Sequence, residues 1–111
     1  MIAIREYQDR DGHSPFSGWH KSLHAEAARK VTTALYRMGL GNLSNVKGVG
    51  NGVLEYKINF GPGYRVYFGK DGETLVLLLA GGTKQRQQTD IRNAVERWDN
   101  YKSRKKQGKG E

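Results

Sequence analysis

The chain has 111 residues, no cysteine, and 19 lysine and arginine residues against 11 aspartate and glutamate residues, which gives a net charge of +8. This length predicts one domain, and we expect neither a membrane helix, which needs a run of roughly 20 apolar residues, nor a secretory signal at the N-terminus. The lack of cysteine excludes disulfide and thiolate chemistry and favours a cytoplasmic location, while the charge indicates a polyanionic partner such as nucleic acid, the ribosome or an acidic protein.

The first forty residues predict one strand and two helices. Residues 2–7 (IAIREY) alternate as a strand does, and residues 8–13 are polar and contain an Asp-Gly turn signal. Ser14 followed by Pro15 is typical of a helix N-cap and first helical position. A second helix is expected at about residues 25–38, where apolar residues repeat with the helical period. The same part of the chain contains the three histidines, His13, His20 and His24. Without cysteine or organised carboxylates beside them, we expect no metal site.

The remainder of the chain predicts three strands and a final helix. The strands are expected at about residues 52–60, 63–69 and 73–80, joined by the turns FGPG and KDG. The third strand, TLVLLLA, is apolar at consecutive positions, as in a central strand covered on both faces. An amphipathic helix follows at about residues 89–102. The order β-α-α-β-β-β-α predicts one α+β domain over residues 1–103, with a small, mainly antiparallel sheet, and a basic flexible tail over residues 104–111.

The hairpin around the FGPG turn has one polar face. Side chains alternate across a strand, so Glu55, Lys57 and Asn59 share a face. Closing the hairpin places Asn59 opposite Arg65 and Lys57 opposite Tyr67, which makes Lys57 and Arg65 diagonal neighbours about 7–8 Å apart. An anion between two such cations would form short, strong contacts. The alternative is an ordinary solvated face of an antiparallel sheet.

Other polar residues extend this candidate site. Lys84, Gln85 and Arg86 emerge where the apolar third strand ends, and the ring of Tyr67 is suited to stacking on a nucleotide base. The residues expected to bind RNA around the site are Asn59, Gln85, Arg86, Arg92 and Lys102. For the last two, the alternative is a solvated helix end.

The sequence also resembles a known family. The run GVLEYKINFGPGYRVYFGKDGETLVLLLAGGTKQ and the later DIRNAVERWDNY are similar to the RelE/ParE superfamily of type II toxins, nearest to the phage-derived addiction-module killer proteins related to HigB. The resemblance covers residues 7–101, and its most specific part is the segment GPGYRVYF. It implies a RelE-like α+β fold related to microbial ribonucleases. It also implies a neighbouring antitoxin, typically a small helix-turn-helix protein.

By position, the resemblance implies that Lys57, Arg65 and Lys84 match basic residues of RelE-like nucleases. Asn59 stands where those nucleases have a second lysine. The segment QQTDI, residues 87–91, stands where they have a tyrosine or histidine at the start of the last helix. The usual general acid is therefore missing or replaced in this chain.

The implied reaction is cleavage of mRNA in the ribosomal A site, without a metal or other cofactor. The ribose 2′-OH attacks the adjacent phosphate in line and leaves a cyclic phosphate and a free 5′-OH. Arg65 is expected to bind the phosphate and Lys57 to act as general base or electrostatically, with Glu55 as the rival base. The candidates for stabilising or protonating the leaving group are Lys84, Tyr67 and Arg86. Replacing Arg65 with alanine is expected to remove cleavage and leave the fold intact.

The resemblance leaves two other functions open, because the fold does not fix the activity. ParE-like members poison DNA gyrase. A catalytically weak module that only binds nucleic acid or the antitoxin is the third possibility, since the last helix lacks the tyrosine or histidine.

Overall fold

The computed structural model describes residues 1–109, and the side chains of residues 1–107. The helices are α1 (Pro15–Ser22), α2 (Ala25–Gly39) and α3 (Gln87–Lys109), and a short 3-10 turn (Lys84–Arg86) precedes α3. The strands are β1 (Ala3–Glu6), β2 (Val46–Gly50), β3 (Val53–Ile58), β4 (Tyr64–Asp71) and β5 (Leu75–Thr83). They form one sheet in the order β1-β5-β4-β3-β2, in which β1 is parallel to β5 and the other pairs are antiparallel. The predicted α+β fold is confirmed.

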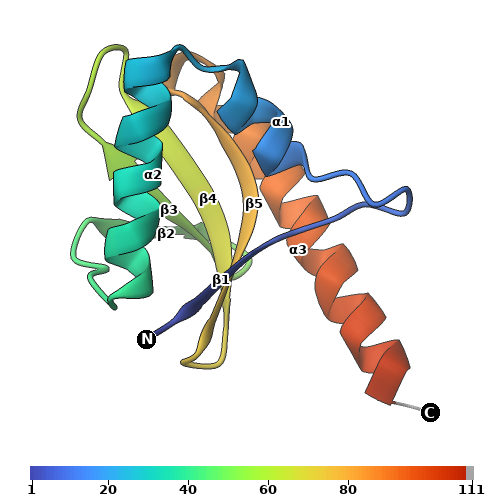
Figure 1. Cartoon of the computed structure of the whole chain (residues 1–111). Coiled ribbons are helices and arrows are strands. Elements are labelled where there is room, and N and C mark those ends of the chain that lie inside the picture. Colours follow the sequence, from blue (N-terminus) through green and yellow to red (C-terminus); the bar gives the residue numbers. More distant parts are fainter. Residues whose placement is uncertain (110–111) are drawn as a thin grey trace.

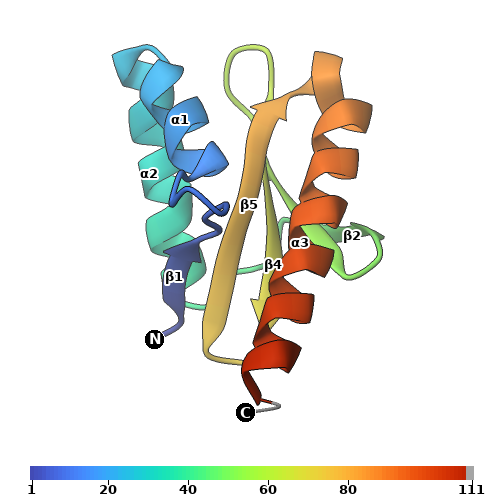
Figure 2. The same ribbon diagram turned by 90° about the vertical axis from the view of Figure 1, so that its right-hand side faces the viewer.

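Helices cover both faces of the sheet. Helices α1 and α2 lie on one face and α3 lies on the other, as Figures 1 and 2 show. Because side chains alternate along a strand, successive residues of β4 enter different cores. Val66 and Phe68 pack with residues of α1 and α2, whereas Tyr67 packs with Ala94 and Trp98 of α3. The apolar strand β5 contributes to both cores, as expected for a central strand.

Two glycines allow tryptophans to pack directly against the sheet. A Cβ atom at Gly81 would lie 2.0 Å from the ring of Trp19 on α1, and one at Gly69 would lie 2.3 Å from the ring of Trp98 on α3. No side chain fits between strand and ring at either position. The two glycines therefore set how closely α1 and α3 approach the sheet.

The structure adds a strand that the sequence did not predict. Residues 46–50 (VKGVG) form β2, which pairs with β3 and has an irregularity between Gly48 and Gly50. Its glycines and the surrounding asparagines are typical of a loop, so only the pairing with β3 identifies it as a strand. Asn51 and Gly52, both with positive φ, make the turn into β3.

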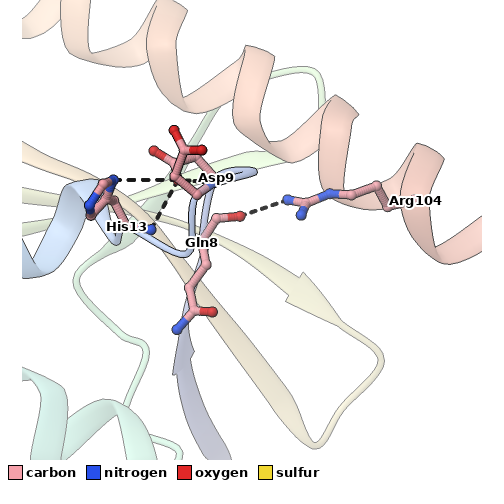
Figure 3. A network of polar contacts seen from close by, with 5 residues as sticks. Gln8, Asp9, His13 and Arg104 are labelled. Atoms are coloured by element: carbon pink, nitrogen blue, oxygen red, sulfur yellow. Dashed lines mark hydrogen bonds and ion pairs between the residues drawn. The ribbon is translucent and has the colours of Figure 1, made fainter.

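The last helix is longer than predicted. It continues to Lys109 rather than ending near residue 102, so most of the expected flexible tail is helical; residues 110 and 111 lie outside the described residues. Arg104 donates a hydrogen bond of 2.9 Å to the carbonyl of Gln8 in the loop after β1 (Figure 3), and Lys105 donates to both carboxylate oxygens of Asp71 at the end of β4. These contacts hold the extra turns against the body of the protein. None of the described helices, α3 included, has the length and apolar character needed to cross a membrane.

The histidines do not converge in the described part of the chain. His24 caps α2 by accepting a hydrogen bond from the backbone N–H of Ala27, and His20 contacts the carbonyl of Ala28. His13 lies beside Asp9 in the loop after β1 (Figure 3), and the ligand atoms of Asp9, Asp11 and His13 lie within 4.8 Å of one another. One oxygen of Asp9 already accepts the backbone N–H groups of Asp11 and His13, so hydrogen bonds within the turn account for this cluster.

Candidate functional site

Lys57 and Arg65 lie on one face of the sheet, directly opposite each other in β3 and β4. The sequence predicted the shared face, but its register was wrong by two residues. Ile58 pairs with Tyr64, and Phe60 lies beyond the end of β3. The turn between the strands is therefore longer than FGPG alone. A shift of two residues keeps every side chain on its face and brings the two cations closer along the strand than predicted.

Most of this face is covered by α3 and is not solvated. Glu55 is 2% exposed, Arg65 is 6% exposed and Tyr67 is fully buried. Tyr67 therefore cannot stack on a nucleotide base, and it cannot reach a leaving group, so both predicted roles for it are wrong. Burial raises the pKa of the Tyr67 phenol well above its ordinary value, and the neighbouring Glu55 carboxylate adds to that effect.

Glu55 is the centre of a buried polar network. Its Oε2 accepts a hydrogen bond of 2.8 Å from Nε2 of Gln87 and lies 3.5 Å from Nε of Arg65, while its Oε1 lies 3.7 Å from Nζ of Lys47 on β2. A carboxylate engaged by three partners and shielded from solvent holds the arginine in place. This arrangement does not suit the role of a mobile base for a substrate in the pocket.

The charged residues predicted from the hairpin line one pocket. Lys57, Arg65 and Lys84 surround a space of about 330 Å³, together with Asn59, Phe60 and the glycine-proline-glycine turn. Lys57 and Lys84 are exposed, whereas Arg65 is buried, and its Nη1 donates a long hydrogen bond of 3.4 Å to the carbonyl of Gly63. Three cations and an amide around a space of this size suit a phosphate with part of its nucleotide.

The other residues predicted to bind RNA do not line this pocket. Gln85 and Arg86 are exposed in the 3-10 turn, and Arg92 is exposed on α3. Lys102 lies near the far end of β4, where its Nζ is 5.6 Å from the centre of the Trp98 ring and 3.7 Å from a carboxylate oxygen of Asp99. The predicted set therefore divides into a pocket group and scattered surface residues.

Sequence reasoning missed three residues around the pocket. Gln87 and Lys47 hold Glu55, and Asp90 lies on the first turn of α3, buried to 9% exposure. Oδ2 of Asp90 has no hydrogen-bond partner among the described residues, and it would lie 1.9 Å from a Cβ atom at Gly82. Lys47 had no signal, because the sequence did not predict its strand. Gln87 and Asp90 lie in the segment QQTDI, which differs from the RelE pattern. This difference was the one feature of the sequence that could have drawn attention to them.

Burial raises the pKa of Asp90 above its ordinary value, and the positive charges of Arg86 and Arg97 oppose the shift. Arg97 is itself half-buried and donates a hydrogen bond of 2.8 Å to the carbonyl of Leu79. Helix α3 is thus fastened to β3 through Gln87 and Glu55, and to β5 through Arg97 and the carbonyl of Leu79.

The fold and this pocket define a small α+β protein with a cationic site at the end of a β-hairpin. No family model matches the chain. A protein of Haemophilus influenzae, described only as an uncharacterized protein, is 38% identical over 80 residues, which make up 71% of this chain and 81% of the relative. The chain belongs to the same family as that protein.

Proposed function

We propose that the protein is the toxin of a type II toxin–antitoxin system and acts as a metal-independent endoribonuclease on mRNA in the ribosome. The observation that carries this proposal is the convergence of Lys57, Arg65 and Lys84 on one pocket. The similarity of the hairpin sequence to RelE-like toxins supports the same reading. The proposal includes a cytoplasmic location and a small helix-turn-helix antitoxin as partner, and it needs no cofactor.

In the proposed reaction, the pocket holds the scissile phosphate. Two exposed lysines, Lys57 on β3 and Lys84 in the turn after β5, line this pocket together with the buried Arg65. The 2′-oxygen attacks phosphorus, the bond to the 5′-oxygen breaks, and the products are a 2′,3′-cyclic phosphate and a 5′-OH. Lys57 takes the 2′-OH proton, Arg65 stabilises the added negative charge, and Lys84 donates a proton to the leaving oxygen.

Controlled expression in a bacterial host, followed by mapping of mRNA 5′ ends, tests the proposal. Cuts within translated reading frames are expected with the wild type and not with Lys57→Ala, because this variant lacks the proposed base. The Lys57 side chain is exposed, so its removal should leave the fold intact. Intact mRNA with stalled gyrase would instead support ParE-like inhibition. The matched control is Lys21→Ala, which removes an exposed lysine on α1 and should leave the cuts unchanged.

A second candidate, a module that binds RNA without cutting it, is favoured by one observation. Tyr67 and Glu55 are withdrawn from solvent, and the described lining of the pocket contains no carboxylate, phenol or imidazole. Only lysine and arginine then remain for proton transfer. Retention of RNA by the purified protein, without new 5′ ends in cells, would select this candidate.

A further inference from the structure

A second pocket adjoins the first along the free edge of β3. It encloses about 320 Å³ between β3 and α2, and it shares Lys57, Asn59 and Phe60 with the first pocket. The two spaces meet at these three residues, at the end of β3, and we call them together the groove. The first space lies on the α3 side of the sheet with Arg65, and the second lies on the α2 side with Tyr56 and Ile58. A chain of nucleotides can pass from the first pocket to the second around the free edge of β3, where no residue of β2 pairs with it.

The second pocket is open because β2 is short. The pairing of β2 with β3 ends at Val46 and Tyr56, so no residue of β2 pairs with Lys57 or Ile58. One stripe of α2 forms the opposite wall, with Lys30 and Arg37 two turns apart and Thr33 between them. This wall adds two cations to the three of the first pocket.

Phe60 is the aromatic residue that lines both pockets. Its ring is partly exposed, stacks on the ring of Tyr64 with centroids 6.4 Å apart at 23°, and has Nζ of Lys30 at 5.3 Å from its centre. An exposed lysine already reaches the ring, so the aromatic face is accessible from solvent. A flat base can take the place of the ammonium group, and the flexible lysine can then turn toward the phosphate of the same nucleotide.

The charge of the groove has one sign. Its described lining includes five cations, Lys30, Arg37, Lys57, Arg65 and Lys84, and no aspartate or glutamate. The nearest buried carboxylate, Glu55, is already paired with Arg65 and Lys47. A polyanion that follows the groove therefore meets attraction along its whole length.

We propose that this second pocket binds the nucleotide next to the scissile phosphate, with its base on Phe60 and its phosphate between Lys30 and Arg37. The proposal rests on the proposed function, since it places the neighbour of the phosphate held by Lys57 and Lys84. It specifies unpaired RNA as the substrate, because a base within a duplex cannot stack on a protein ring.

Binding of a short 2′-O-methyl RNA strand, measured by fluorescence anisotropy over a series of salt concentrations, tests this inference. The probe lacks a free 2′-OH and stays intact. Phe60→Leu, which keeps apolar volume without the ring, should weaken binding roughly 5- to 150-fold, the range for one base–aromatic stack. Lys30→Ala should reduce the slope of log K against log salt by about 0.7, the value for one phosphate contact on a single strand. The fully paired duplex should bind without any dependence on Phe60.

The controls are Tyr36→Leu, an exposed aromatic on α2 outside the groove, and Lys21→Ala. Both should bind as the wild type does, and thermal melts must show that every variant is folded. If Lys57→Ala weakens binding but Phe60→Leu and Lys30→Ala do not, the second pocket is not a nucleotide site and the proposed function stands. If the wild type does not bind the strand, or if Lys57→Ala has no effect, both proposals are overturned. Equal weakening by Tyr36→Leu would also overturn the assignment of Phe60.

Discussion

Arg65 both lines the pocket and pairs with the buried Glu55, so a single substitution of Arg65 changes both the site and the stability of the fold. Its guanidinium borders the pocket, yet its Nε lies 3.5 Å from a carboxylate that is 2% exposed. Removing one partner of a buried ion pair leaves an uncompensated charge in a medium of low dielectric constant. The sequence predicted that alanine at position 65 leaves the fold intact. Because Arg65 is buried and paired with Glu55, we instead expect the substitution to destabilise the fold.

Arg65→Ala should lower the free energy of unfolding by about 3 kcal/mol, the lower end of the range for breaking a buried pair, because Lys47 and Gln87 still compensate Glu55. Urea unfolding measures this loss. The double variant Glu55→Leu with Arg65→Met should recover most of the stability and none of the RNA affinity. If Arg65→Ala is as stable as the wild type, the ion pair does not have the structural role assigned to it.

Asp90 predicts a pH dependence of stability. Its pKa is raised in the native state, chiefly by burial, so the native protein holds this proton more tightly than the unfolded chain does. The stabilising contribution of the protonated group is complete below the ordinary pKa of aspartate, and it is lost as the pH rises through the raised native pKa. Asp90→Asn cannot lose the proton, so its stability relative to the wild type should increase with pH across that window. Urea unfolding at a series of pH values checks this, and a difference that does not change with pH would contradict it.

At the scale of elements, α1 and α3 are positioned by glycines of the sheet, which leave room for tryptophan rings because they have no side chain. Gly69 admits Trp98, and Gly81 admits Trp19. The alternation of apolar residues predicted β3, β4 and β5, because each strand has its own repeating pattern. It could not predict β2, whose glycine-rich sequence forms a strand only through backbone pairing with β3, nor the register of the hairpin, which depends on the conformation of the turn.

Gly69→Ala should destabilise the protein by about 1–3 kcal/mol or more, since its Cβ would overlap the Trp98 ring and force α3 away from the sheet. The matched control is Gly48→Ala in the edge strand β2, where no atom lies within 4 Å of the new Cβ. Thermal unfolding of the two variants compares them. Similar melting temperatures would show that α3 can move without cost, against the tight packing seen at Trp98.

The final turns of α3 give a further prediction. Asp71 accepts hydrogen bonds from the Tyr101 hydroxyl and from Lys105, which lies in the segment expected to be a flexible tail. Asp71→Ala should therefore reduce hydrogen-exchange protection of the amides of residues 102–107. Global stability should change by no more than about 1 kcal/mol, because the lysine contact is partly solvated. Unchanged protection would mean that these turns are helical without Asp71.

At the scale of the whole molecule, only part of the positive charge gathers at the two pockets, and other cations such as Arg92 and Lys102 lie elsewhere on the surface. Lys57, Arg65 and Lys84, which the sequence predicted to share a site, line one pocket, because strand alternation and the end of β5 fix their faces. It could not predict that α3 covers the rest of that face and buries Glu55 and Tyr67, since the packing of a distant helix leaves no mark on the hairpin sequence. The groove at Phe60 was also not predicted, because residues from α2 and β3 meet there only in the folded protein.

The central claim is that the exposed lysines of the pocket direct attack by a ribose 2′-OH on mRNA in the ribosome. The most direct measurement uses purified protein, translating ribosomes and an mRNA that carries either ribose or 2′-deoxyribose at a cut position mapped in cells, followed by analysis of the product ends. We predict cleavage of the ribose substrate alone, with a 2′,3′-cyclic phosphate and a 5′-OH, and none by the folded double variant Lys57→Ala with Lys84→Ala. Cleavage of the deoxyribose substrate, undiminished cleavage by the double variant, or no cleavage by the wild type would contradict the claim.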